Sequence, residues 1–352
     1  MAKDGPIGIG IAGIGRAGWG MHCAELAGKE NLFRIVAACD VLKDRRDKMA
    51  AKYGCRIYTR VEDMAANPDV ELVDVATRSP EHLPHALIGL KAGKHVFLEK
   101  PICLTYAEAL KLKAAAARAK GKLFIRHNRR FEPTFNHIRE IMASGILGKV
   151  YEIKLRRLGY ARRDDWQTLM KCGGGQMLNW GPHIIDHALR LLESPVKSVW
   201  ADLKTVACVG DAEDHFKIIL TGKNGRVIDI EISGGAAIKE PEYIVLGTKG
   251  GLTSSEEDIT LRYLDASVKL PPRKPDPGAP GAHFGSPEKL PWIEKTIPVC
   301  PAYKSDMPNS IWYELHSAIR KGTRFPITTD ESVAVMKVIS AAKKGTKYAT
   351  RK

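Results

Sequence analysis

The N-terminal stretch Ile7-Gly-Ile-Gly-Ile-Ala-Gly13-Ile-Gly15-Arg-Ala-Gly18 decides the fold of the first half of the chain. Its first six residues predict a buried strand over 7–12, which runs directly into a GxGxxG turn. A helix-like segment over 16–27 and a second apolar strand over 35–40 follow. This order of elements is typical of the unit that binds the pyrophosphate of a dinucleotide, and a turn with a purely structural role is the alternative.

Asp40 ends the second strand, 22 residues beyond Gly18. An acid at this place can accept hydrogen bonds from the adenosine ribose and repels a 2′-phosphate. The sequence therefore predicts NAD as the cofactor. NADP is the alternative, because Lys43, Arg45 and Arg46 are near enough in sequence to hold a phosphate. The residues expected to bind the cofactor in this unit are Gly13, Ile14, Gly15, Arg16, Ala17, Gly18, Asp40 and Arg45.

Helical and extended apolar segments continue to alternate as far as residue 126. The expected helices cover 43–53, 81–92 and 105–119, and the expected strands cover 71–76, 95–99 and 122–126. Such alternation predicts an α/β fold with a doubly wound parallel sheet, whose ligands lie at the carboxyl ends of the strands.

Two of these strand ends carry chemically useful side chains. Thr77-Arg-Ser-Pro-Glu-His82 follows one strand, and Glu99-Lys100-Pro101 follows the next. A lysine at the ligand edge of a sheet can hydrogen-bond a hydroxyl that loses its proton and can stabilise the resulting oxyanion. The alternative for Lys100 is an isolated surface lysine in a turn.

A second informative stretch is Cys172-Gly-Gly-Gly-Gln-Met-Leu-Asn179-Trp-Gly-Pro-His183-Ile-Ile-Asp186-His187. Pro182 suits the first turn of a helix. The helix is expected to have one apolar side (Ile184, Ile185, Ala188, Leu189, Leu191, Leu192) and one ionisable side (His183, Asp186, His187, Arg190). The positive end of the helix dipole keeps His183 neutral, although a solvated ionisable face is the alternative. No Cys or Glu at ligand spacing joins the histidines, so we expect no metal.

From Val150 onward the hydrophobic pattern changes to alternation. Alternating stretches cover 150–157, 196–206, 214–221, 225–232 and 242–247. They predict an antiparallel sheet, with one face on its own helices and the other toward a partner or the active site.

Residues 268–308 contain ten prolines. Such a segment cannot supply central strands, so we expect an extended arm or lid anchored by Trp292 and Tyr303. The arm either wraps a neighbouring subunit or closes over the substrate. A surface excursion without a function is the alternative.

The composition is that of an ordinary globular protein with room for two domains. Of its 352 residues, 44% are hydrophobic and 27% are charged, and the formal charge is +15. The basic residues are spread along the chain, so we expect a general affinity for anions but no binding of nucleic acid. Seven cysteines at irregular spacing, no signal pattern and no membrane span favour a reduced, cytoplasmic protein.

These motifs, together with His127-Asn-Arg-Arg-Phe-Glu-Pro133 and the ending over 311–331, resemble the Gfo/Idh/MocA oxidoreductase family across nearly the whole chain. The resemblance implies a Rossmann domain over 1–127 that binds NAD(P). It also implies a substrate-binding and oligomerisation domain over 128–352 with a large, open, mostly antiparallel sheet. A sugar, polyol or glycoside would lie between nicotinamide and sheet, and a homodimer or homotetramer would form through the sheet.

The resemblance also supplies candidate site residues. The family's catalytic lysine, aspartate and histidine correspond to Lys100, position 179 and His183, but position 179 is Asn, which cannot exchange a proton. We therefore expect His183 to be the general base, Lys100 to stabilise the alkoxide and Asn179 to position the substrate, while Asp186 is structural. Further expected contacts are Thr77, His82, Glu99, Lys100 and Asn128 with the cofactor, and Lys100, Arg129, Tyr160, Arg163, Trp166, Asn179 and His183 with the substrate.

The arginine pairs 129/130, 156/157 and 162/163 are expected to be mostly solvated, with some meeting an anionic substrate. Three functions remain open at this point. The first is an NAD-dependent dehydrogenase acting on a hydroxyl-bearing carbon of a sugar, polyol or glycoside. The others are glycoside cleavage through transient oxidation and elimination with retained NAD, and a non-catalytic NAD-dependent sensor or regulator.

Overall fold

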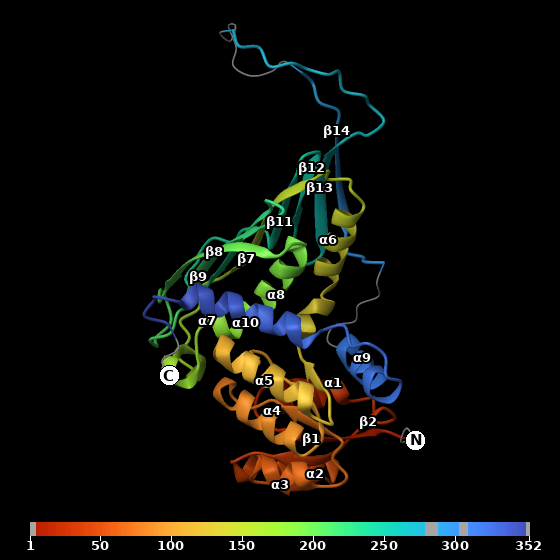
Figure 1. Ribbon diagram of the computed structural model, residues 1–352, viewed down its shortest axis with the longest axis vertical. Helices are drawn as coiled ribbons and strands as arrows, with labels where there is room; N and C mark the ends of the chain where they lie inside the picture. Colours follow the sequence, from red (N-terminus) through yellow and green to blue (C-terminus); the bar gives the residue numbers. More distant parts are fainter. Residues whose placement is uncertain (1–4, 279–287, 303–308, 350–352) are drawn as a thin grey trace.

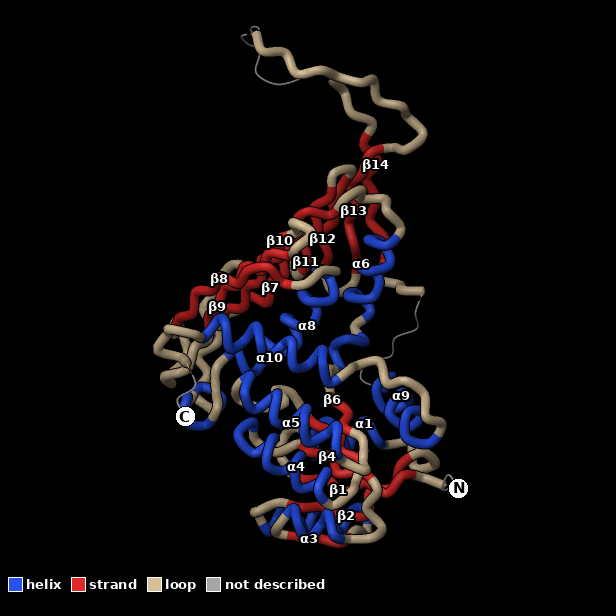
Figure 2. Tube along the Cα trace, viewed as in Figure 1, coloured by secondary structure: helices blue, strands red, loops and turns tan. Residues whose placement is uncertain are grey.

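The computed structural model describes residues 5–278, 288–302 and 309–349. It places them in two sheets, each with helices packed against it (Figure 1). The N-terminal sheet and its helices form one end of the molecule, and the larger sheet forms the other end, as the distribution of strands in Figure 2 shows. The α/β class expected from the sequence is confirmed.

The N-terminal sheet is parallel throughout and has the strand order β3-β2-β1-β4-β5-β6. Its strands are β1 (Ile7–Ala12), β2 (Phe33–Cys39), β3 (Arg56–Tyr58), β4 (Leu72–Val75), β5 (His95–Leu98) and β6 (Leu123–Ile125). The order reverses between β1 and β4, which creates a crevice at their carboxyl ends. This is the doubly wound sheet that the alternation predicts.

Short connections and helices join these strands. A π-helical turn, η1 (Gly18–His22), leads into α1 (Cys23–Leu26), and the further helices are α2 (Lys43–Tyr53), α3 (Val61–Ala66), α4 (His82–Lys91) and α5 (Tyr106–Arg118). The sequence did not indicate β3 and α3, because both are short. The apolar side chains of β1 are fully buried, which explains why its sequence shows no alternation.

The C-terminal sheet has eight strands in the order β14-β13-β12-β11-β7-β10-β9-β8. They are β7 (Val150–Leu158), β8 (Val196–Lys204), β9 (His215–Gly222), β10 (Val227–Ser233), β11 (Tyr243–Gly247), β12 (Gly250–Ser254), β13 (Asp258–Leu264) and β14 (Trp292–Pro298). All neighbours are antiparallel except β7 and β10. The expected mostly antiparallel sheet is therefore confirmed.

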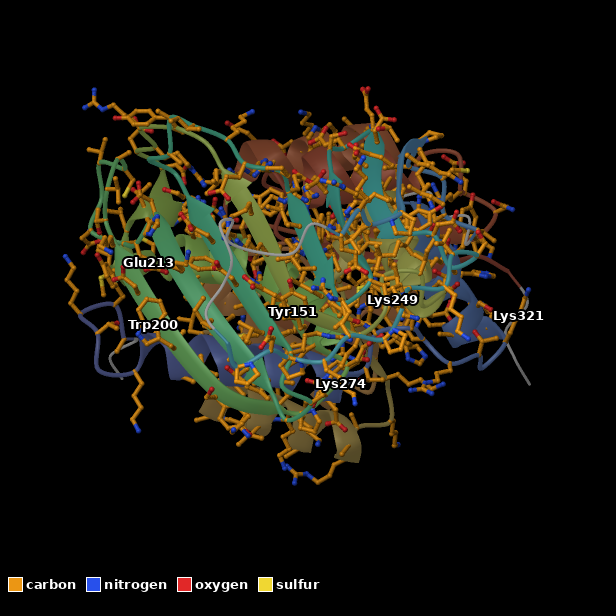
Figure 3. All side chains as sticks on the ribbon, turned by 90° about the horizontal axis from the view of Figure 1, so that it is seen from above. Tyr151, Trp200, Glu213, Lys249, Lys274 and Lys321 are labelled. Carbon is orange, nitrogen blue, oxygen red and sulfur yellow. The ribbon has the colours of Figure 1, made fainter. Side chains whose placement is uncertain are left out.

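Three long helices, α6 (Pro133–Ala143), α8 (Gly181–Leu192) and α10 (Thr329–Lys343), lie on one face of this sheet (Figure 1). The other face carries no helix among the described residues, and Figure 3 looks onto it. Trp200 on this face is 56% exposed. The alternation of buried and half-buried residues along β9 follows from this two-sided environment.

The proline-rich segment contains a strand. Its β14 pairs with β13 at the edge of the sheet, a place that tolerates proline. The segment between β13 and β14, whose described residues are 265–278 and 288–291, projects away from both sheets (Figure 1). Trp292 lies in β14 with the Arg262 guanidinium 5.1 Å from its ring centroid, while Tyr303 lies outside the described residues.

One helix of the C-terminal half returns to the N-terminal sheet. The helix α9 (Asn309–Arg320) lies beside α1 in Figure 1. Its Trp312 is fully buried, with its ring centroid 5.0 Å from that of Phe97 and 5.6 Å from that of Phe33. Residues more than 200 positions apart thus form one core. No helix within the described ranges is long and apolar enough to cross a membrane.

Candidate active site

The glycine-rich turn combines close packing with one open position. A Cβ on Gly13 would lie 2.7 Å from Thr77 N, and a Cβ on Gly18 would lie 2.0 Å from the Gly13 carbonyl oxygen. Neither residue can therefore carry a side chain. A Cβ on Gly15 would meet nothing closer than the Arg45 guanidinium at 3.6 Å. The backbone at Gly15 is thus open to a ligand, as a pyrophosphate site requires.

Asp40 lies beside this turn at the end of β2. Its Oδ2 accepts a hydrogen bond from Ile14 N at 2.8 Å, and its Oδ1 accepts one from Leu42 N at 2.9 Å. Arg45 pairs with the same carboxylate at 3.3 Å, and Arg46 donates to the Asp40 carbonyl at 2.7 Å. The protein therefore holds a fixed acceptor where an adenosine ribose would lie. The residues of this strand, turn and acid fit a dinucleotide.

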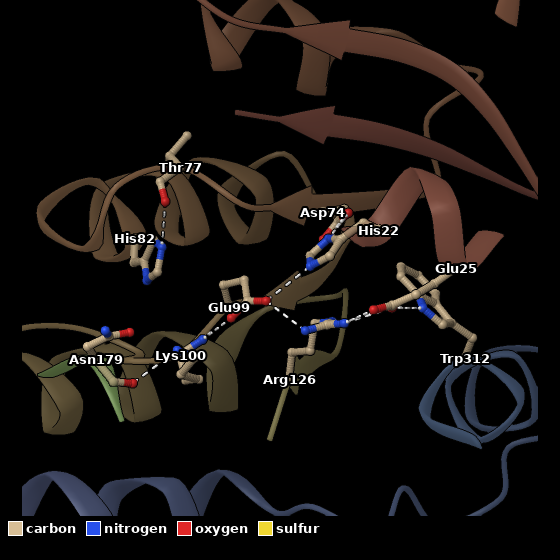
Figure 4. A network of polar contacts seen from close by, with 10 residues as sticks. All are labelled: His22, Glu25, Asp74, Thr77, His82, Glu99, Lys100, Arg126, Asn179 and Trp312. Atoms are coloured by element: carbon tan, nitrogen blue, oxygen red, sulfur yellow. Dashed lines mark hydrogen bonds and ion pairs between the residues drawn. The ribbon is translucent and has the colours of Figure 1, made fainter. Parts of the chain in front are cut away.

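Lys100 follows β5 and faces the C-terminal half of the chain. Its Nζ donates to the Asn179 carbonyl oxygen at 3.0 Å (Figure 4). Burial lowers the pKa of Lys100, while the neighbouring Glu99 carboxylate opposes this effect. The ammonium is therefore easier to deprotonate than an exposed lysine.

The His82 side chain connects the loop after β4, which contains Thr77, to the loop after β5, which contains Pro101. The His82 ring has Nδ1 2.6 Å from the Pro101 carbonyl oxygen and Nε2 3.0 Å from the Thr77 carbonyl oxygen. The hydroxyl of Thr77 lies 3.1 Å from Nδ1 of His85. The Glu99 carboxylate is likewise bound within the protein, by His22, Arg126 and the main-chain N of Lys100. These side chains shape the loops that line the crevice, and their direct contact with the cofactor stays a prediction.

Glycines at left-handed angles bring Asn179 and His183 toward Lys100. Gly173 and Gly175 have φ of 70° and 106°, and a Cβ on Gly175 would lie 2.3 Å from Oε1 of Glu213. The chain then forms α7 (Gln176–Asn179) and α8. Only glycine suits position 175, because both the backbone angle and the carboxylate exclude a side chain.

His183 is buried in the first turn of α8, and its Nδ1 has no partner among the described residues. Burial and the positive charge of Lys100 hold its pKa well below the usual value of a histidine. The ring is therefore neutral at neutral pH. The His127 ring lies 6.2 Å away, and His127 Nδ1 and Asn128 Oδ1 are also buried without partners in the described part of the chain. Unpaired polar atoms gathered at one place indicate a site for a ligand.

The ionisable side of α8 is largely buried. The alternative that this face of the helix is simply solvated is therefore wrong. Asp186 is fully buried and pairs with the Arg130 guanidinium at 2.5 Å. His187 stacks on Phe135 with the ring centroids 3.9 Å apart, and its Nδ1 lies 2.9 Å from the Tyr243 hydroxyl. The helix is packed on both sides, and Asp186 is held in a buried ion pair. This agrees with the expectation that Asp186 is a structural residue.

The expectation that most paired arginines are solvated is wrong for two of them. Arg130 binds Asp186 and Glu331, and Arg156 binds Asp229 at 2.8 Å with a side chain only 4% exposed. These guanidinium groups are buried because carboxylates from distant strands and helices face them, which a local pattern cannot reveal.

The expected substrate contacts occupy different places. Arg163 donates to Gln167 Oε1 at 2.5 Å, and Gln167 in turn donates to Asn179 Oδ1 at 3.5 Å. Arg129 pairs with Glu132 and stacks its guanidinium 4.1 Å from the Trp180 ring centroid. Trp166 packs against the Arg78 guanidinium at 5.6 Å, while Tyr160 is 65% exposed at the edge of the sheet. Gln167 thus links Arg163 to Asn179.

A recess of about 360 Å³ adjoins Asn179. Its polar lining includes Arg163, Gln167, Gln176 and Glu213. Both Gln176 Oε1 and Glu213 Oε2 are buried without a partner among the described residues, and burial raises the pKa of Glu213. The sequence reasoning missed Gln176 and Glu213, although Gln176 directly follows the three glycines.

The sequence reasoning also missed a buried network behind Lys100. His22, Asp74, Glu99 and Arg126 contact one another there, and Glu25 and Trp312 extend the cluster (Figure 4). The one local signal is an acid within the apolar strand β4, where Asp74 is fully buried.

Comparison with known proteins defines the class of this site. Residues 7–127 match the family model of an oxidoreductase family with an NAD-binding Rossmann fold, and residues 135–253 match the GFO/IDH/MocA C-terminal domain. The protein therefore falls in a class of oxidoreductase-family proteins with an NAD-binding Rossmann domain. More particularly, the chain belongs to the Gfo/Idh/MocA family.

Individual relatives agree with this assignment. The chain is 30% identical to D-glucoside 3-dehydrogenase of Escherichia coli over 70% of this chain and 77% of that protein. It is 25% identical to scyllo-inositol 2-dehydrogenase (NADP(+)) of Bacillus subtilis over 98% of this chain and 95% of that protein. A solved NAD-binding protein from Listeria innocua has 26% identity and a TM-score of 0.81, and the match covers 97% of this chain and 98% of that one.

Proposed function

We propose that the protein is an NAD-dependent dehydrogenase that acts on a hydroxyl-bearing carbon of a sugar, polyol or glycoside. The observation that carries this proposal is a buried neutral imidazole close to a half-buried ammonium. His183 keeps Nδ1 unpaired, and Lys100 reaches the Asn179 carbonyl in the same site. One group can accept a proton and the other can stabilise the oxygen that loses it.

The two side chains divide the work on the alcohol. His183 accepts the hydroxyl proton as the C–O bond gains double-bond character, and Lys100 donates a hydrogen bond to that oxygen. When bound, NAD supplies the hydride acceptor, so the alcohol carbon loses a hydride while the oxygen loses a proton, and a ketone results. Arg16, at the glycine-rich turn, adds a positive charge near Lys100.

Asn179 has a positioning role in this mechanism. Its amide cannot take up a proton, and its side-chain oxygen lies at the end of the hydrogen-bonded series from Arg163 through Gln167. Proton transfer therefore depends on His183 alone, whereas a carboxylate at position 179 would raise the basicity of the imidazole.

The polarity of the recess supports a substrate with several hydroxyl groups. Gln176 and Glu213 present unpaired acceptor oxygens, which match hydroxyl donors. The names of two relatives, a D-glucoside 3-dehydrogenase and a scyllo-inositol 2-dehydrogenase, agree with this class. For the cofactor, the fixed carboxylate of Asp40 favours NAD over NADP, because it repels a 2′-phosphate.

We also propose that the helix-free face of the C-terminal sheet joins two or four copies of the chain. Trp200 is exposed there, and apolar surface of this kind is usually covered in an assembly. Sedimentation of the purified protein tests this, and a monomer at micromolar concentration would refute it.

The activity is tested with purified protein and a substrate panel. Mass spectrometry first asks whether a nicotinamide cofactor is bound, and absorbance and product masses are then followed with polyols, free sugars and glycosides. Net reduction of NAD with a keto product is the expected result, and Lys100→Met protein serves as the inactive control. Cleavage of a glycosidic bond without net reduction would replace this proposal by transient oxidation and elimination. Bound cofactor with no turnover would indicate a sensor.

A further inference from the structure

His22 lies at the end of η1, directly behind the crevice of the Rossmann domain. It is fully buried, and each ring nitrogen faces a carboxylate. Nδ1 lies 2.7 Å from Asp74 Oδ2, and Nε2 lies 3.1 Å from Glu99 Oε1 (Figure 4). A neutral imidazole has only one N–H, so the ring can donate to both oxygens only when it is protonated.

Glu99 links this histidine to Lys100. Its Oε1 accepts hydrogen bonds from His22 and from Arg126 Nη1 at 2.8 Å, and its Oε2 accepts one from the main-chain N of Lys100 at 3.0 Å. The carboxylate therefore fixes the backbone at Lys100, and its charge acts on the Lys100 ammonium.

Arg126 closes the network. It binds both oxygens of Glu25 at 2.6 and 2.7 Å, and the indole of Trp312 donates to Glu25 Oε2 at 2.6 Å. The cluster then holds three cations (His22, Lys100, Arg126) and three anions (Glu25, Asp74, Glu99). A buried set of charges is costly unless each has a partner, so the loss of one cation leaves the remaining charges out of balance.

Charged side chains from several neighbouring elements face His22 and Lys100. His22 faces Asp74 on β4, Glu99 after β5 and Arg126 after β6, with the rings of Phe97 and Trp312 on its other sides. Burial and the Arg126 charge lower the pKa of His22, but the two carboxylates of Asp74 and Glu99 outweigh them and raise it to about 9. Lys100 is influenced by Glu99, Arg126, Arg129 and Arg16, and its charge in turn acts on His82, His127 and His183.

We propose that His22 is a positioning residue of the active site: protonated between Asp74 and Glu99, it offsets the negative charge of Glu99 and thereby makes the Lys100 ammonium a stronger hydrogen-bond donor toward the substrate oxygen. The step is electrostatic and requires no bond to change. The value of a stronger donor for catalysis rests on the proposed dehydrogenase function. The electrostatic effect on Lys100 does not rest on it.

The test measures the titration of Lys100 in the cofactor-free protein. Lysine labelled with ¹³C at Cε is followed by NMR against pH, and Lys100→Arg protein identifies the resonance. In His22→Gln protein we expect the pKa of Lys100 to rise by roughly one unit, a tenfold change, because Glu99 then acts on it with less compensation. Glu99→Gln should shift the same titration in the opposite direction.

His316→Gln is the matched control. His316 lies on α9, one helical turn after Trp312, and packs on Phe33 without contacting a carboxylate of the cluster. It should leave the titration of Lys100 unchanged. If His22→Gln does not fold, His22→Gln combined with Asp74→Asn removes one buried charge of each sign and still removes the imidazolium that contacts Glu99. An unchanged Lys100 titration in either folded variant would overturn the proposal.

Enzyme kinetics then separates the two proposals. The alkaline limb of kcat/KM against pH should move upward in His22→Gln, while the acidic limb stays in place. A purely structural role of His22 would lower the rate at all pH values without moving a limb. A shifted NMR titration in a protein without dehydrogenase activity would uphold the role of His22 and refute the proposed function.

Discussion

The two sides of the active site differ in how their polar groups are used. On the Rossmann side, His22 and Arg126 both hydrogen-bond Oε1 of Glu99, at 3.1 and 2.8 Å. Nearer the C-terminal domain, His127 at the end of the Rossmann domain and His183 on α8 each keep a buried Nδ1 without a partner among the described residues. The charged side chains of the first group are held in ion pairs, although Arg126 Nε is also buried without a partner, whereas neither imidazole of the second group forms an ion pair within the described part of the chain.

This difference assigns separate roles to the two sides. A buried polar atom without a partner costs free energy, which a ligand can recover by binding to it. A network held together by ion pairs instead fixes geometry and sets the electric field at its edge. We therefore expect changes at His183 to affect turnover first, and changes in the network of His22, Glu99 and Arg126 to affect stability first.

The largest effect is expected for His183→Asn. Loss of the general base should lower kcat/KM by roughly 10²- to 10⁴-fold. The free energy of unfolding should change by only about 1 kcal/mol, because no hydrogen bond of Nδ1 is lost. Steady-state kinetics and urea denaturation measure the two quantities. A large loss of stability with normal turnover would contradict the division of roles.

Arg126→Met should show the reverse pattern. Without the guanidinium, Glu25 and Glu99 remain buried without their main counter-ion, which should cost about 3–5 kcal/mol of stability. Urea denaturation gives this value. Lys43→Met is the control, since the Lys43–Asp47 pair is exposed and should contribute less than about 1 kcal/mol. Equal losses in both variants would show that burial of the network does not matter.

The pH dependence of stability sharpens the comparison further. The pKa of His22 is about 9 in the folded protein and about 6.5 in the unfolded chain. Its charge therefore stabilises the fold fully below pH 6.5, and this contribution of about 3 kcal/mol is lost as the pH rises through 9. Urea denaturation from pH 6 to 9.5 should show this slope in the native protein. A similar slope in His22→Gln would assign it to another group.

Much of the architecture follows from local sequence. The strand before Gly13, the acid at position 40 and the Glu99-Lys100-Pro101 turn each have a short-range pattern, and the N-terminal sheet confirms the predicted alternation. The helix that begins near Pro182 was also predictable, because its apolar residues repeat at helical spacing.

The network behind Lys100 was not predictable in the same way. Trp312 and Glu25 are 287 residues apart in sequence, and Arg126 and Glu25 are 101 apart. Each residue alone resembles an ordinary surface charge or core aromatic. Their pairing depends on the order of strands and on the return of α9, so it becomes visible only in three dimensions. The same reason explains the buried places of Arg130 and Arg156.

The return of α9 to the N-terminal sheet has a consequence for modular engineering. A nucleotide-binding module cut at residue 127 would lack Trp312, and so would leave an uncovered hole beside Phe33 and Phe97. A chimera that exchanges cofactor modules between relatives must therefore transplant α9 together with its own N-terminal segment. In this chain the segments needed to complete the core of the cofactor-binding domain are therefore discontinuous in sequence: the N-terminal sheet and α9.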